Sequence, residues 1–217
     1  ATPSMAQPKV DPAKRGSDTR EVMQDKVPAT RIYRVWNVAQ ADSLDNDQLQ
    51  LLAQVLGGSK ASRLDKRLLH DEKLVDAISA GLDSSQLGSG FIVMATVKPG
   101  VDPAKVEAAI DEEVKKLVTA GPTAAELEQA KTVTRAGFIR GIERIGGFGG
   151  KADVLAECAV YTGNPGCFRE SLANMAAATP AQIKAVGGKW LASGSHTLVI
   201  EPGERTPLAE EPSVTPA

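Results

Sequence analysis

The sequence has few of the side chains on which nucleic-acid binding and membrane insertion depend. Only 4% of its 217 residues are aromatic, and 25 basic against 27 acidic residues leave a net charge of -2. A basic surface and stacked aromatic rings are the usual means of holding DNA or RNA, so no nucleic-acid partner is expected. A membrane-spanning helix needs about 18 consecutive apolar residues. No apolar run in the sequence approaches this length, so no membrane span is predicted.

Histidine is also scarce, which bears on zinc chemistry. The chain has two histidines, His70 and His196. Both zincin motifs, HExxH and HxxEH, need a second histidine four residues after the first, and Leu74 stands there after His70. A zinc-activated water needs about three protein ligands held together. The sequence therefore predicts no catalytic residue and no metal ligand in this chain.

The two cysteines, Cys158 and Cys167, leave two alternatives open. A disulfide between them would close a short loop and would suit a periplasmic or secreted protein. Two buried thiols in a helical region are an equally good interpretation.

Both ends of the sequence lack a sustained hydrophobic period. Residues 1–30 carry four prolines among charged side chains, which predicts a flexible linker or arm. Residues 203–217 have the same character and are predicted to be a flexible tail. The first residue is Ala1 rather than Met, and we interpret the chain as a processed or excised piece of a longer protein.

Residues 31–202 predict one α+β domain. Apolar residues recur with the period of strands or helices, and Ser, Asp and Thr stand where helices should begin. The predicted strands are 31–38, 74–82, 91–97 and 195–200, and the predicted helix caps are Ser43, Ser59, Asp102, Thr123 and Thr179. Strands do not alternate one for one with helices, so an antiparallel or mixed sheet with helices on one face is favoured.

A glycine-rich stretch, Ile139–Ala152 (IRGIERIGGFGGKA), raises the question of a phosphate site. A Walker loop needs G-x-x-x-x-G-K followed by Ser or Thr, after a strand. Ile145 stands where the first glycine should be, Ala152 stands where the hydroxyl should be, and the preceding segment reads as a helix. We therefore predict a sharp break between two helices, which glycine permits.

A second glycine segment, residues 55–69 (VLGGSKASRLDKRLL), links two predicted helices and carries four basic side chains besides its paired glycines. Flexible backbone and positive charge could meet the carbonyls and acidic groups of a peptide. The alternative is a helix–helix turn with an exposed basic face, which is common on protein surfaces.

The order and spacing of several stretches together resemble the pitrilysin/insulinase-like zinc metallopeptidases, peptidase family M16. The resemblance covers nearly everything from Arg31 to Pro202. It is carried by RIYRVWNV, VLGGSKASRLDKRLL, GSGFIVMATVKPGVD, GPTAAELEQAK and RGIERIGGFGGKADVLA.

This resemblance implies an α+β domain of the C-terminal, non-catalytic type. In this family two halves close like a clamshell around a peptide, and one half holds zinc through HxxEH and a distal glutamate. The present chain lacks that motif, so the resemblance implies no cofactor here and zinc in a partner catalytic half, on the same polypeptide or a separate subunit. It also implies a periplasmic location.

The resemblance further points to a substrate-binding segment. Gly57, Gly58 and Ser59 are similar, in shortened form, to the glycine-rich segment that recognises substrate in mitochondrial processing relatives, and Lys60 and Arg63 follow them. Some members place an Arg and a Tyr near the scissile bond, but residues 79–91 hold glycines and short polar side chains instead. A substrate-enclosing domain is expected, and the alternative is a purely structural module like those of respiratory complexes.

Overall fold

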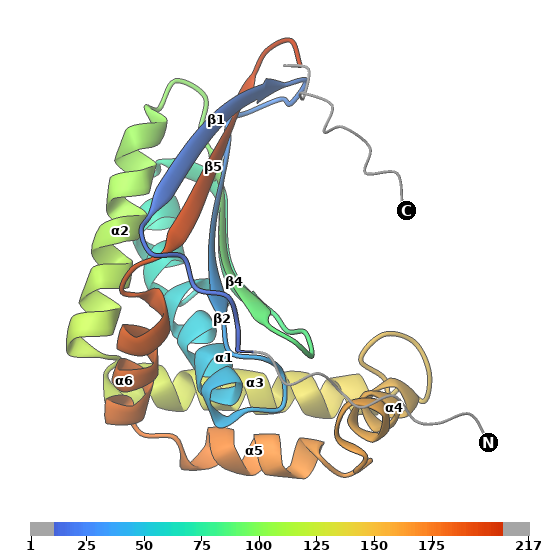
Figure 1. Cartoon of the computed structure of the whole chain (residues 1–217). Coiled ribbons are helices and arrows are strands. Elements are labelled where there is room, and N and C mark those ends of the chain that lie inside the picture. The colour runs from blue at the N-terminus through green and yellow to red at the C-terminus, as the bar shows by residue number, and fades with distance from the viewer. Residues whose placement is uncertain (1–10, 206–217) are drawn as a thin grey trace.

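The computed structural model describes residues 11–205, and a five-stranded sheet lies at the centre of the fold (Figure 1). The strand order is β1-β5-β2-β4-β3. β1 and β5 are parallel, whereas the other neighbours are antiparallel, so the sheet is mixed. The strands are β1 Thr19–Asp25, β2 Arg31–Val38, β3 Val75–Asp83, β4 Ser89–Val97 and β5 Ser195–Pro202.

The helices lie on one side of this sheet, which confirms the predicted α+β architecture. They are α1 Leu44–Gly57, the short π-helix η1 Asp65–Asp71, α2 Pro103–Ala120, α3 Ala124–Ile142, α4 Lys151–Thr162, α5 Phe168–Ala177 and α6 Pro180–Leu191. In Figure 1, α1, α2 and α6 cover one face of the sheet, while α3 and α5 run side by side at one end, and α4 connects them at their far ends.

Local capping chemistry fixes where four of the helices begin. The side chains of Ser43, Asp102, Thr123 and Thr179 each accept a hydrogen bond from a backbone N–H in the first turn of α1, α2, α3 and α6. Thr123 and Thr179, two of the predicted caps, also form reciprocal capping boxes with Glu126 and Gln182.

The core lies between the sheet and its helices. Trp36 of β2 and Phe91 of β4 meet edge to face, with ring centroids 5.9 Å apart. Beneath them lie leucines of α1, including Leu49, Leu52 and Leu56, none of which has any exposed surface. The inner face of the sheet is therefore sealed against water by α1 and its neighbours.

The predicted flexible arm is wrong over Thr19–Asp25, which form edge strand β1. This strand pairs with β5 from Thr19 opposite His196 to Asp25 opposite Pro202. Most of its side chains are exposed, so the strand lacks the apolar alternation by which strands are found in a sequence. Residues 1–10 and most of the predicted tail, 206–217, lie outside the described residues.

The helix predicted to begin at Ser59 begins later in the structure and is mainly a π-helix. Bends and a turn occupy residues 58–62, helical backbone starts at Arg63, and residues Asp65–Asp71 form the π-helix η1. The Glu72 N–H donates to the Arg67 carbonyl at 2.8 Å, five residues back, which is the wider hydrogen-bond spacing of a π-helix.

Candidate functional site

The predicted substrate segment, residues 57–63, connects α1 to η1 beside β3. Gly57 is the last residue of α1, and the backbone of β3 approaches it closely. A Cβ at Gly57 would lie 2.6 Å from the Ala80 nitrogen and 2.8 Å from the Ala80 Cβ. Real Cβ atoms do not approach this closely, so Gly57 is explained by the packing of α1 against the sheet.

The middle of the same segment is open to solvent. Gly58 and Lys60 are exposed, and Ser59 is half-buried. The Ser59 carbonyl accepts a hydrogen bond from the Ser62 N–H at 3.0 Å, which fixes the turn. Over residues 11–205, Lys60 makes no ion pair, so its ammonium is available to a ligand.

Unlike Lys60, Arg63 already has hydrogen-bond partners within the domain. Its Nε and Nη2 donate to the two carboxylate oxygens of Glu126 at 2.7 and 2.8 Å, and Nη2 also donates to the Gly121 carbonyl at 3.2 Å. The hydrogen bond from Arg63 lowers the pKa of Glu126 to about 2. Arg63 thus ties the segment to the first turn of α3.

The side chains that could bind zinc are dispersed through the fold. His70 Nε2 lies 3.2 Å from an oxygen of Asp65, and His196 Nδ1 lies 2.9 Å from the Thr19 hydroxyl. In the described part of the chain, no three His, Cys, Asp or Glu side chains gather where they could hold a metal ion. The donor set in this part of the chain does not fit a zinc centre.

The loop from residue 143 to 150 joins α3 to α4, as the sequence predicts for a break between helices. A phosphate at the start of α4 would need free N–H groups there. Instead, the N–H groups of Lys151 and Ala152 donate to the carbonyls of Arg144 and Ile145 at 2.8 and 2.9 Å. The Gly149 N–H donates to an Asp153 carboxylate oxygen at 2.7 Å. These donors already have partners, which argues against a phosphate site.

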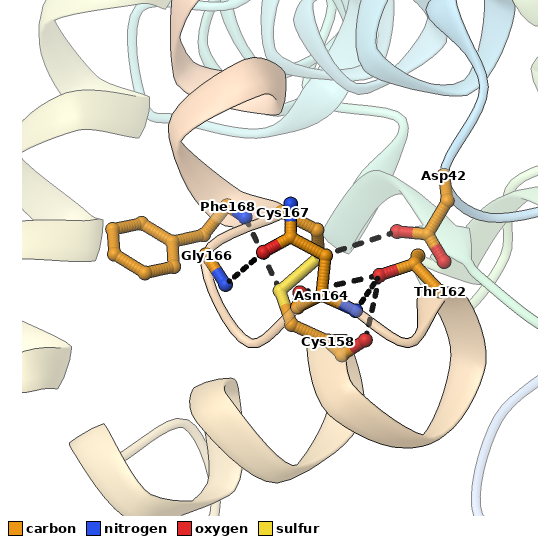
Figure 2. The surroundings of a disulfide bond; sticks show 7 residues. All are labelled: Asp42, Cys158, Thr162, Asn164, Gly166, Cys167 and Phe168. Carbon is orange, nitrogen blue, oxygen red and sulfur yellow. Dashed lines mark hydrogen bonds between the residues drawn. A yellow bond between two sulfur atoms is a disulfide. The ribbon is translucent and has the colours of Figure 1, made fainter.

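Of the two alternatives for the cysteines, the structure has the disulfide (Figure 2). Cys158 and Cys167 are joined with their Cα atoms 5.4 Å apart. Gly163, in the left-handed conformation with φ 72°, ends α4 and turns the chain back. The Phe168 N–H approaches the Cys158 sulfur at 3.2 Å. The disulfide therefore fixes the end of α4 against the start of α5.

The second face of the sheet has no helix over it in the described residues (Figure 1). Tyr33 lies opposite Met94 on one side and Leu198 on the other, and Val35 lies opposite Ile92. Met94 is 45% exposed. A shallow depression of about 270 Å³ follows this face between β2, β4 and β3. We call these five side chains, Tyr33, Val35, Ile92, Met94 and Leu198, the open sheet face.

The arrangement defines an α+β domain whose sheet has helices on one side and whose described residues bring together no metal centre. The family model of the peptidase M16 inactive domain matches residues 1–134. This match covers more than half of the sequence, so the chain belongs to the M16 inactive-domain family. No curated protein matches the sequence.

Solved structures with similar folds are consistent with this assignment. A protease from Helicobacter pylori is 18% identical, with a TM-score of 0.79 over 93% of this chain and 48% of that one. A peptidase M16 inactive domain from Pseudomonas fluorescens is 16% identical, with a TM-score of 0.76 over 94% of this chain and 48% of that one. The periplasmic protease PqqL from Escherichia coli is 12% identical, with a TM-score of 0.64 over 86% of this chain and 21% of that one.

At these low sequence identities, the similarity shows only that the folds are alike. The covered share of each chain shows that this chain is shorter than the similar proteins. The chain spans about half the length of the first two proteins. Within residues 11–205, no helix has both the length and the apolar character to cross a membrane.

The sequence alone did not identify the open sheet face. Alternation along β2 places Tyr33 and Val35 on the side away from the buried Ile32 and Trp36. Only the pairing of β2 with β4 and β5 brings Met94, Ile92 and Leu198 beside them. The sequence feature that points to this face is the composition of β4, which is apolar on both of its faces.

Proposed function

We propose that this chain is a non-catalytic, substrate-enclosing domain of an M16-type zinc peptidase. Zinc and the HxxEH motif belong to a partner catalytic half, on the same polypeptide or a separate subunit. The domain completes the wall of a chamber around an extended peptide. Its contribution is to position the peptide and exclude water, and the bond-breaking chemistry occurs on the partner.

The open sheet face is the observation that carries this proposal. Met94 is exposed and the other four side chains of this face are half-buried. Fully burying an exposed apolar side chain is favourable by about 1.5–3 kcal/mol, and exposed apolar surface often marks an interaction site. The chain also spans about half the length of two similar proteins. We infer that the rest of such a protein lies over Tyr33, Met94 and their neighbours and that the chamber forms between the two parts.

The exposed turn after α1, beside edge strand β3, is proposed as a second peptide contact, separate from the open sheet face. Gly58 has no side chain to block a peptide backbone, Ser59 offers a hydroxyl, and Lys60 offers an unpaired charge. Gly57 and Arg63 support this turn from behind, through the close contact with β3 and the pairing with Glu126. Peptides with acidic or carbonyl groups near the turn are the ligands that this chemistry favours.

A periplasmic location is part of the proposal. Disulfides such as Cys158–Cys167 persist in oxidising compartments and are rare in the cytosol of mesophiles. The similar protein PqqL is described as a periplasmic protease.

Reconstitution tests the proposed function. The HxxEH-bearing half is incubated with a fluorogenic peptide, alone and with increasing amounts of this chain. We expect the initial rate of cleavage to rise until the two proteins reach equal concentration. A parallel assay presents the same peptide sequence within a folded protein, which should resist cleavage in the complex because the chamber excludes it.

Two results would contradict the proposal. A cleavage rate that is equally high without this chain would show that it encloses no substrate. A stable complex of the two proteins that cleaves no peptide would favour the purely structural alternative.

A further inference from the structure

Exposed apolar side chains are concentrated at one end of the fold. Of ten large hydrophobic side chains that are exposed among the described residues, six lie between Ile139 and Tyr161. Ile145 is 80% exposed and Phe148 is 96% exposed, and both belong to the loop between α3 and α4. We call these two side chains the apolar knob. In Figure 1 this loop projects beside α4, away from the helices that cover the sheet.

The knob stands on a hydrogen-bonded loop. Hydrogen bonds from Lys151 and Ala152 to Arg144 and Ile145 close its base, and the Gly150 N–H donates to the Gly147 carbonyl at 3.0 Å. Gly147 and Gly149 have φ values of 82° and 70°, in the region that favours glycine. A Cβ at Gly150 would lie 2.6 Å from the Gly146 carbonyl oxygen. The glycines thus permit a closed loop that holds Phe148 outward. Because the loop already has this conformation, its binding to a partner should cost little conformational entropy.

Basic side chains flank the knob. Arg140 precedes the loop and Lys151 follows it, and both are exposed. Across residues 11–205 neither of them forms an ion pair. An apolar centre that contains an aromatic ring, with charged residues around it, is the composition of a protein–protein interface.

The shape of the knob indicates a folded partner. A side chain that is 96% exposed projects from the surface, so it needs a pocket on the other molecule. An extended peptide is usually held the opposite way, by a groove or a strand edge on the protein. The two similar proteins of which this chain spans 48% have room for a second part of about equal size. We propose that Ile145 and Phe148 dock into an apolar pocket of the zinc-bearing catalytic half, an inference that rests on the proposed function.

The test measures the affinity of this chain for the separately purified HxxEH-bearing half by biolayer interferometry. Phe148→Ser should weaken binding about 10- to 30-fold, as expected for an aromatic hot spot, and Ile145→Ser should weaken it several-fold. Leu44→Ser is the matched control, because Leu44 is 50% exposed but lies in the first turn of α1. This control should bind like the wild type, and urea unfolding should show that all variants are folded.

Each alternative result has a definite meaning. If wild type and Phe148→Ser bind equally well, the knob is not the docking site, while the proposed function stands. If the wild-type chain does not bind the catalytic half at all, the inference and the proposed function fail together. If sedimentation shows that the wild-type chain dimerises and Phe148→Ser does not, the occupant is a second copy, which overturns the inference.

Discussion

Arg63, in the connection between α1 and η1, holds Glu126 in the first turn of α3 through two parallel hydrogen bonds of 2.7 and 2.8 Å. The same carboxylate accepts the Thr123 N–H at 2.7 Å and thereby completes the capping box of α3. Parallel hydrogen bonds between a guanidinium and a carboxylate are strong and geometrically specific. A residue that the sequence placed in the substrate segment therefore links two parts of the domain.

This ion pair predicts a dependence of stability on pH. The hydrogen bond from Arg63 lowers the pKa of Glu126 from 4.5 to about 2. A carboxylate with a lowered pKa stabilises the fold fully above pH 4.5, and this stabilisation is lost as the pH falls through about 2. Allowing for solvent screening, we expect Glu126→Gln to lower the free energy of unfolding by about 1–2 kcal/mol at pH 7.

Urea unfolding of the wild type and Glu126→Gln at several pH values measures this effect. Glutamine can still cap α3, so the variant removes the ion pair and spares the cap. The difference between the two proteins should narrow as the pH is lowered from 5 towards 2. Glu128→Gln, at an exposed site on the same helix, is the control. If the difference in free energy of unfolding between the wild type and Glu126→Gln did not depend on pH, its assignment to the Arg63–Glu126 ion pair would be wrong.

Gly57→Ala should destabilise the fold, although alanine normally stabilises a helix. The added Cβ would lie 2.6 Å from the Ala80 nitrogen, so α1 or β3 must shift. We expect a loss of about 1–3 kcal/mol, as for overpacking of a core. Gly81→Ala is the matched control, since nothing lies within 4 Å of its added Cβ. If chemical denaturation shows that Gly57→Ala is as stable as the wild type, α1 and β3 do not pack as closely at Gly57 and Ala80 as described.

Removing the disulfide should destabilise the domain and loosen the end of α4. The bond joins cysteines that are 9 residues apart, and a loop of this size predicts a loss of about 2–3 kcal/mol. Cys158→Ser combined with Cys167→Ser should show this loss in urea unfolding, with faster amide exchange in α4 and α5. Reducing agent should affect the wild type and leave the double variant unchanged. Equal sensitivity of both proteins to reducing agent would refute the explanation.

Lys60→Ala should weaken peptide binding in the reconstituted complex. Because Lys60 is exposed and unpaired among the residues that the structure describes, its loss should leave folding unchanged. We expect the KM for a peptide with acidic residues to rise about 2- to 5-fold, the effect of one partly screened charge. Lys66→Ala, another exposed lysine nearby, is the control. The proposed contact would be wrong if the two variants gave the same KM.

Features that depend on neighbouring residues could be predicted from the sequence. Thr123 and Glu126 are three residues apart, and so are Thr179 and Gln182, so both capping boxes are local patterns. The core strands β2 and β4 likewise carry their own apolar pattern. These elements, together with their order along the chain, were enough to predict an α+β fold with helices on one face.

Features that depend on distant partners could not be predicted. β1 is held by β5, whose residues lie 177 positions further along the chain, and by the bidentate pairing of Arg20 with Glu107. Its exposed side chains leave no hydrophobic pattern. Arg63 belongs to a visibly basic segment, but its partner Glu126 lies 63 residues away. The sequence shows the charge of Arg63 and gives no sign that it is already paired.

Zinc analysis of the purified chain tests the central claim most directly. The chain is dialysed against buffer with trace zinc, its metal content is measured by mass spectrometry, and its hydrolysis of a fluorogenic peptide is recorded. We predict that zinc stays far below one ion per chain and that hydrolysis begins only after the HxxEH-bearing half is added. One tightly bound zinc ion per chain, with peptide hydrolysis by the chain alone, would contradict the account.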